Sequence, residues 1–112
     1  MQRDESGYLR DMLFYARKIQ EHVQGLTRAE FEENELIAAG IVYYLQVIGE
    51  AASRVSKEYR QIQPSIPWDS IARMRNRLVH NYFDINYTVV WLAATTEMQP
   101  LIDTLKQLVS DD

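Results

Sequence analysis

The sequence predicts an all-α fold, a bundle of about four main helices that associates as a homodimer. Three observations support this prediction. Apolar residues recur at the 3.6-residue spacing of amphipathic helices in several segments of the chain. One central segment is apolar nearly all the way round, which is typical of a helix buried on more than one side. Capping residues, glycine and proline separate these segments, and no strand-like alternation, glycine-rich loop or internal repeat is evident in the sequence.

Length, charge and composition restrict the classes of function. The 112 residues suffice for one domain, which we expect to span residues 1–112. The net charge of -4 argues against indiscriminate binding to nucleic acid or acidic membranes, so any such binding requires a local basic patch. The chain has no cysteine, which removes disulfides and thiolate metal sites. No signal peptide is visible, and we expect a cytoplasmic protein.

The first half of the chain predicts two helices joined by a short helical turn. Residues 8–24 carry one apolar face, and Gly25 lies where a C-terminal cap would sit. That face consists of Leu9, Met12, Leu13, Ala16, Ile19 and Val23. Thr27 and Glu30 fit a capping box, in which two side chains and two backbone donors satisfy each other, so a short turn begins there. Asn34 is placed to cap the helix that follows.

The apolar helix expected over residues 36–55 has two interpretations. A membrane span requires about 20 apolar residues, and Gln46 and Glu50 leave this run too short and too polar. A soluble helix would pack one face on the first helix and another on a second subunit, with Gly40 and Gly49 permitting close approach. We favour the dimer. Glu50 itself is either exposed or a buried group that needs a partner such as an arginine.

The second half of the chain predicts two further helices. Pro67 suits the first position of a helix, because its missing N–H would have no intrahelical partner, and this helix continues to His80. The inward stripe of this helix consists of Ile71, Met74 and Leu78. The last helix begins near Tyr87. Pro100 lies inside its apolar pattern and should kink or split it near Met98.

Residues 73–82 hold more polar chemistry than a small helical domain needs. Residues four apart share one face of a helix, so Asn76 and His80 are neighbours. Arg73 and Arg77 extend the same strip. Arg75 points to a different face, although its long side chain would reach toward His80 if the helix loosened near its end.

Arginine and histidine together suit phosphodiester chemistry. A guanidinium group binds phosphate bidentately, and histidine exchanges a proton near neutral pH. His22 and His80 are far apart in the chain and no cysteine is present, so we expect neither a metal nor a cofactor. Metal-independent RNA cleavage needs a base, an acid and a cation on the phosphorane. One protomer offers a single suitable histidine, whereas a two-fold dimer would offer two copies each of His80 and Arg75.

Plainer interpretations exist for the same residues. An arginine-rich helix end is commonly a solvated face, and His80 would then be a cation that complements the helix dipole. The tyrosines of the chain would be core or interface aromatics. His22, alone on the first helix, fits a structural role better than a functional one.

The spacing of Arg75, His80 and Tyr82, with Asn76 directly after the arginine, resembles the signature of the HEPN superfamily. The resemblance is specifically to its HepT-like branch of minimal HEPN toxins. Three further blocks occur in the order that the family uses: VIGEAA at residues 47–52, IPW at 66–68 and VW at 90–91. Together the four blocks extend the resemblance over nearly the whole chain, about residues 8 to 109.

This resemblance implies an all-α, four- to five-helix HEPN-type bundle that forms a homodimer. It also implies a metal-independent endoribonuclease, the toxin of a type VII-like toxin–antitoxin system. Arg75 and His80 of both protomers would be catalytic at the dimer interface, and Asn76 would support them. The partner would be a minimal nucleotidyltransferase antitoxin, which would neutralise the toxin by transferring AMP from ATP to Tyr82. AMP would add negative charge and bulk beside the arginines and so repel RNA phosphate.

Two rival functions remain open from the residues. The chain would be a non-catalytic regulatory subunit of a nucleotidyltransferase, whose groove binds a nucleotide or RNA without cutting it, or a purely structural helical dimer. The joint presence of the motif residues favours the ribonuclease over the structural dimer. Binding a phosphate and cleaving beside it require the same residue types. The residues therefore distinguish the non-catalytic subunit from the ribonuclease poorly. We assign Arg73 and Arg77 to contact with the RNA backbone, and we expect no membrane partner.

Overall fold

The computed structural model describes residues 5–80 and 84–109 and is all-α over these residues, with no strand among them. The long helices are α1 (Glu5–Val23), α3 (Glu35–Arg54), α5 (Trp68–His80) and α7 (Met98–Leu108). Shorter helical segments lie between them: α2 (Arg28–Glu33), α4 (Lys57–Ile62), α6 (Tyr87–Leu92) and a π-helical turn, η2 (Ala93–Glu97). The predicted all-α fold with about four main helices is confirmed.

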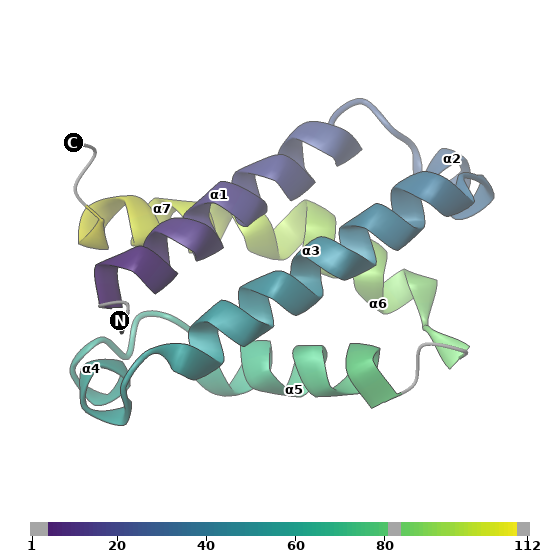
Figure 1. Ribbon diagram of the computed structural model, residues 1–112. Helices are drawn as coiled ribbons and strands as arrows, with labels where there is room; N and C mark the ends of the chain where they lie inside the picture. The colour runs from purple at the N-terminus through teal and green to yellow at the C-terminus, as the bar shows by residue number, and fades with distance from the viewer. Residues whose placement is uncertain (1–4, 81–83, 110–112) are drawn as a thin grey trace.

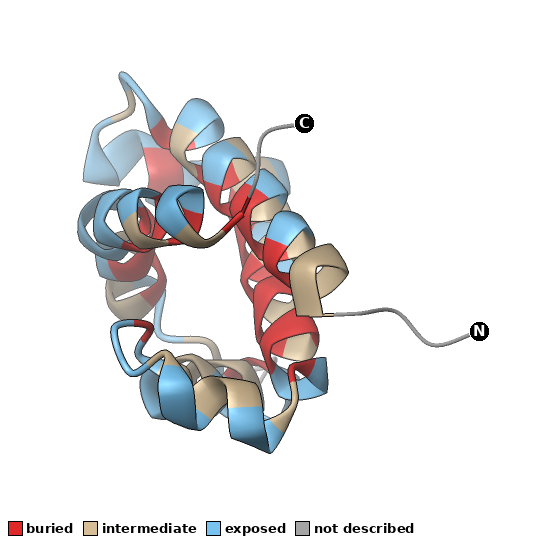
Figure 2. Cartoon of the chain, turned by 90° about the vertical axis from the view of Figure 1, so that its left-hand side faces the viewer, coloured by how far each residue is buried: buried red, intermediate tan, exposed pale blue. Residues whose placement is uncertain are grey.

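Helix α3 is the centre of the arrangement. It lies between α1 and α5, while α6, η2 and α7 pass behind (Figure 1). Helix α1 packs on both α3 and α7, and α5 packs chiefly on α3. Buried residues face the interior from α1, α3 and α7 (Figure 2), and all six residues of the predicted apolar face of α1 are buried. In contrast, α5 buries only Leu78 and leaves Ile71 and Met74 partly exposed.

The connection from α1 to α3 contains the glycine and the capping residues that the sequence predicts. Gly25 has φ +81°, the left-handed conformation that glycine adopts at helix ends. The capping box is present: the Thr27 hydroxyl accepts from the Glu30 N–H at 3.1 Å, and the Glu30 carboxylate accepts from the Thr27 N–H at 2.9 Å. The Asn34 side chain accepts from the N–H of Ile37 at 3.0 Å and so caps α3.

Pro100 interrupts the last helical segment as predicted. Proline has no N–H to donate, and its ring excludes the carbonyl four residues earlier. The chain widens into the π-helical turn η2 before α7 begins at Met98. Within this turn the hydroxyls of Thr95 and Thr96 donate to the backbone oxygens of Trp91 and Leu92 at 2.7 and 2.6 Å. Such π-helical turns often occur at functional sites.

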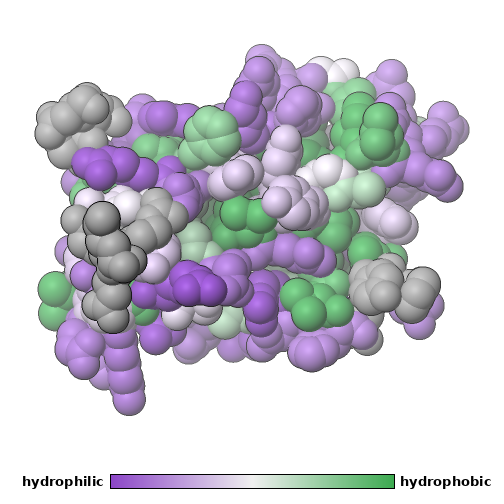
Figure 3. All heavy atoms as spheres, viewed as in Figure 1, coloured by the Kyte–Doolittle hydropathy of each residue, from purple (hydrophilic) through white to green (hydrophobic). Residues whose placement is uncertain are grey.

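The apolar residues of α3 are divided between the core and an outward stripe. By length and composition α3 could cross a membrane, and 44% of its most apolar window is buried inside the domain. Leu36 and Tyr43 point outward, with 85% and 58% of their surface exposed. Hydrophobic residues are visible among hydrophilic ones on the face that α1 and α3 form (Figure 3). The predicted dimer on this face stays a prediction.

Candidate functional site

The site is built on α5, which is fixed at its start, its middle and its end. At the start, the Pro67 carbonyl accepts the first helical hydrogen bond from Ile71 at 3.0 Å, so the proline immediately precedes the helix. The Trp68 indole N–H donates to the carbonyl oxygen of Gln63 at 2.9 Å. These bonds hold the entry to α5 against the preceding loop.

In the middle, α5 lies directly against Gly49 of α3. A Cβ atom added to Gly49 would come within 2.3 Å of the Arg75 Cβ and 2.5 Å of its Cγ. Only glycine therefore permits this helix spacing. The expectation that Gly49 serves close approach of a second subunit is wrong, because Arg75 of the same chain occupies that space. A Cβ atom added to Gly40 would meet no heavy atom of another part of the protomer within 4 Å, so this position has open space for a side chain.

Arg75 is held by an ion pair with Glu50. The Arg75 guanidinium donates to the Glu50 carboxylate at 2.9 Å, and the side chains are 34% and 43% exposed. The other Glu50 oxygen pairs with Arg54 at 3.1 Å. Arg75 also donates to the side-chain oxygen of Asn76 at 3.3 Å. Glu50 is thus partly exposed and has an arginine partner, and Asn76 contacts the arginine that it was predicted to support.

At its end, α5 is bonded to α3 through Gln46. The Gln46 side-chain amide donates to the backbone oxygen of Leu78 at 3.3 Å. Carbonyls in the last turn of a helix lack an intrahelical partner, so this bond satisfies a group that would otherwise need water. Gln46 and Glu50 are four residues apart on α3 and contact α5 from the same side. The sequence interpretation missed this role of Gln46, although two polar residues one turn apart in an apolar helix were a usable signal.

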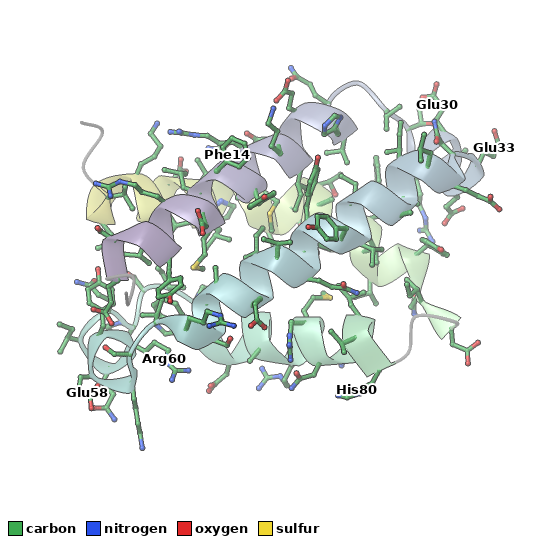
Figure 4. The ribbon with its side chains drawn as sticks, viewed as in Figure 1. Phe14, Glu30, Glu33, Glu58, Arg60 and His80 are labelled. Atoms are coloured by element: carbon green, nitrogen blue, oxygen red, sulfur yellow. The ribbon has the colours of Figure 1, made fainter. Side chains whose placement is uncertain are left out.

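His80 is the last residue of α5 and is exposed. It lies at the C-terminal end of the helix, on the side away from α3 (Figure 4). It follows Arg75 by five positions, which corresponds to a rotation of roughly 140° around the helix. Arg75 extends to Glu50 rather than toward His80. One protomer therefore does not bring these two predicted catalytic side chains together.

Arg73 and Arg77 lie on the side of α5 away from Arg75, next to the position of His80. Both border a cavity that α5 shares with η2 and α7. Both are exposed, and neither forms an ion pair with a carboxylate of the described residues. Arg73 makes only a long contact, 3.5 Å, to the Ser70 hydroxyl. These two arginines therefore remain available to an anionic ligand.

The remaining candidate residues lie apart from this cluster. Tyr82, the predicted modification acceptor, is outside the described residues. His22 is exposed on α1 and stacks on Tyr44 with ring centroids 6.1 Å apart, which fits its predicted structural role. Over residues 5–80 and 84–109, no group of three or more histidine, aspartate or glutamate side chains gathers as a metal site would require.

Comparison with known proteins shows which family the chain belongs to. A family model described as "Ribonuclease HepT-like" matches residues 12–108. No solved structure matches the chain. Among curated proteins, "Putative RNase MJ1216" of Methanocaldococcus jannaschii is 33% identical over 109 residues, which cover 97% of this chain and 90% of that protein.

Two further relatives match over almost their whole length. "Putative RNase TTE0752" of Caldanaerobacter subterraneus subsp. tengcongensis is 30% identical over 105 residues, covering 94% of each chain. "Probable ribonuclease HepT" of Thermococcus cleftensis is 27% identical over 108 residues, covering 96% of this chain and 98% of that protein. The match of the family model over residues 12–108 confirms the resemblance that the motif indicated, and this chain belongs to the HepT-like ribonuclease family.

Proposed function

We propose that the chain is a metal-independent endoribonuclease whose active site forms between the two protomers of a homodimer from Arg75 and His80. Family membership and the ribonuclease names of the relatives support RNA cleavage. The observation that carries the site is the division of α5: Glu50 and Asn76 hold Arg75 on one face, and His80 is exposed on another.

The proposed reaction uses the ribose 2′-hydroxyl as the nucleophile. His80 of one protomer removes the 2′-hydroxyl proton as the oxygen attacks phosphorus, and a 2′,3′-cyclic phosphate forms. The bond to the 5′-oxygen breaks, and that oxygen takes a proton from the second His80. Arg75 neutralises the charge that develops on the phosphorane oxygens. The reaction therefore needs two histidines and a cation, which two protomers provide.

Glu50 has a positioning role in this scheme. Its carboxylate holds the Arg75 guanidinium in one orientation before RNA binds. Arg54 shares the same carboxylate, so Glu50 retains a positive partner when Arg75 turns to a phosphate. Pre-orientation of this kind lowers the entropy that is lost when the transition state forms.

The dimer would form on the outward stripe of α3. Leu36, Tyr43 and Glu50 are seven residues apart and therefore share one face of the helix. The first two are exposed apolar or aromatic side chains, and the third is the partner of Arg75. A subunit that covers this stripe would consequently lie beside Arg75.

Tyr43→Asp is expected to weaken the dimer by about tenfold or more, because the interface would have to bury a carboxylate in place of an aromatic ring. Sedimentation velocity over a range of protein concentrations measures the change. Ile62→Asp on α4 is the control, since Ile62 is 69% exposed and lies off the stripe. Equal dissociation constants for both variants and wild type would place the interface elsewhere.

We further propose that the protein is the toxin of a toxin–antitoxin pair and that a minimal nucleotidyltransferase controls it. The transferase would join the Tyr82 hydroxyl oxygen to the α-phosphorus of ATP and release pyrophosphate. Mass spectrometry after incubation with the partner and ATP is expected to locate AMP on Tyr82, and Tyr82→Phe should gain none. AMP found only on another residue would contradict this assignment.

RNA cleavage in EDTA tests the ribonuclease itself. Wild-type protein is expected to cut RNA with the chelator present, and His80→Ala should lose about 10²–10⁴-fold in rate, the usual contribution of a general acid or base. His22→Ala is a matched control, because it removes the chain's other histidine from an exposed position on α1. Undiminished cleavage by His80→Ala would rule out the proposed site. The chain would then fit better as a non-catalytic subunit that binds a nucleotide or RNA.

A further inference from the structure

A cavity of about 580 Å³ lies on the side of α5 opposite Arg75. Its walls come from α3 and α5 on one side and from η2 and α7 on the other. Apolar side chains make the floor: Leu45, Ile48, Ile71, Met74, Met98 and Leu101. Pockets that hold small ligands span about 300–1,000 Å³, so this cavity accepts a group of that size.

Two arginines stand at the rim of this cavity. Arg73 and Arg77 are one helical turn apart on α5, and both border the cavity. Arg28, Arg54 and Arg75 are paired with glutamates, whereas these two have no carboxylate partner among the described residues. Two adjacent guanidinium groups match the oxygens of a phosphate.

Hydroxyl groups also border the cavity. Ser70, Thr96 and Thr104 are among its lining residues, together with the carboxylate of Glu97. The cavity thus offers an apolar slot, hydroxyl partners and a positive rim. A nucleotide has the matching parts: a flat base, a ribose with hydroxyls and a phosphate.

The rim also leads to His80. Arg77 and His80 are three residues apart and lie on neighbouring positions of the α5 surface. A phosphate bound at Arg77 would therefore belong to a strand that continues to the histidine. Proteins that recognise RNA commonly splay single bases out of the strand and hold them in pockets of this kind.

We propose that this cavity is a subsite for one unstacked nucleotide of the RNA substrate, with its base on the apolar floor and its phosphate on Arg73 and Arg77. The inference rests on the proposed ribonuclease function, because it places this nucleotide next to the one that is cleaved at His80. Contact of Arg73 and Arg77 with the RNA backbone would not by itself say where a base binds. The proposal places the base in a specific cavity.

Methionine methyl groups allow a direct test of nucleotide binding that does not depend on catalysis. Met74 and Met98 line the cavity, and Met12 is fully buried in the core at 0% exposure. In NMR spectra of protein with labelled methionine methyls, AMP and UMP are expected to shift the Met74 and Met98 signals saturably and leave Met12 unchanged. Shifts produced equally by inorganic phosphate alone, or no shifts at all, would overturn the subsite.

The arginine rim has its own variant and control. Arg73→Gln combined with Arg77→Gln is expected to weaken nucleotide binding about tenfold or more, since both charge-assisted contacts are lost. Arg17→Gln removes an exposed arginine of α1, away from the cavity, and should bind as wild type does. Equal weakening by Arg17→Gln would show a general charge effect and contradict the assignment.

RNA oligonucleotides distinguish a substrate subsite from a site for free nucleotides. In the uncleaving His80→Ala protein, removing one base of a short RNA is expected to weaken binding about tenfold at a single position. Thr104→Trp is expected to fill the cavity and to abolish the dependence of RNA binding on the position of the missing base. Ser70→Trp fills the cavity from α5 and replaces the first variant if that variant does not fold. Mononucleotide binding without position dependence in RNA would indicate a free-nucleotide site and overturn the RNA subsite. Mononucleotide binding by a protein that never cuts RNA would instead refute the ribonuclease proposal.

Discussion

Arg75→Ala is expected to lower kcat/KM for RNA cleavage by about 10²–10³, the usual cost of removing one group that stabilises developing negative charge. The fold should change little, because Glu50 keeps its contact with Arg54. The lost ion pair is partly exposed and contributes about 1 kcal/mol or less to the free energy of unfolding. Cleavage kinetics and urea denaturation of the same preparation separate the two effects.

Arg54→Ala is the matched control for this prediction. It removes the other arginine that contacts Glu50, at 3.1 Å, from the outer surface of α3. Its activity should stay within about threefold of wild type, since a side chain that does not reach the substrate supplies no transition-state contact. Arg75→Lys should remain impaired, because lysine keeps the charge but not the bidentate geometry. Similar losses of cleavage activity in Arg54→Ala and Arg75→Ala would show that Arg75 acts only in the structure and not in catalysis.

Gly49→Ala is expected to destabilise the fold and to displace α5 from α3. The new methyl group would lie 2.3 Å from the Arg75 Cβ, which is fixed to the backbone and cannot rotate away. Overpacking of this kind costs about 1–3 kcal/mol, which exceeds the gain of up to about 1 kcal/mol from replacing glycine in a helix. Cleavage activity should fall as well, because Arg75 would lose its position against Glu50.

Gly40→Ala is the comparison for Gly49→Ala. It lies in the same helix, but its new methyl group would meet no heavy atom outside its own helix turn within 4 Å, so only the helix-propensity gain should be measured. Urea denaturation of both variants in the Tyr43→Asp background keeps dimerisation out of the comparison. Equal stabilisation by both alanines would contradict the close packing of α5 on Gly49.

The sequence predicted the features of the fold that depend on neighbouring residues. The apolar face of α1 and the Thr27 capping box depend on spacings of three or four residues. The interruption before Met98 depends on the missing N–H of Pro100. Each of these signals is complete within one or two helical turns, and each is found in the structure.

Contacts between helices were predicted less well, because they join residues that are distant in the sequence. Glu50 and Arg75 are 25 positions apart, and Gln46 and the Leu78 carbonyl are 32 apart. The sequence indicated that Glu50 needed a partner but not which arginine it was. Gly49 was correctly predicted to permit close approach of another helix, but that helix is α5 of the same chain and not a second subunit. The cavity on the far side of α5 follows from the placement of η2 and α7, which no local pattern encodes.

The arrangement of α5 has one consequence for the candidate site. Arg75 and His80 lie on different faces of the helix, so a single protomer presents half of the proposed chemistry. A two-fold dimer repeats every side chain in the partner, so the proposed site would contain a second Arg75 and a second His80. The proposed cleavage therefore depends on an active site shared between subunits.

Mixed dimers test this most directly. Wild-type and His80→Ala chains, co-expressed with different tags and purified through both, form heterodimers that carry two copies of Arg75 but one His80. Such a heterodimer is expected to cut RNA in EDTA about as slowly as the His80→Ala homodimer, because the shared site needs one histidine as the base and the other as the acid. A heterodimer that recovers about half of the wild-type cleavage rate would show that each protomer carries its own complete site, and it would contradict the shared site.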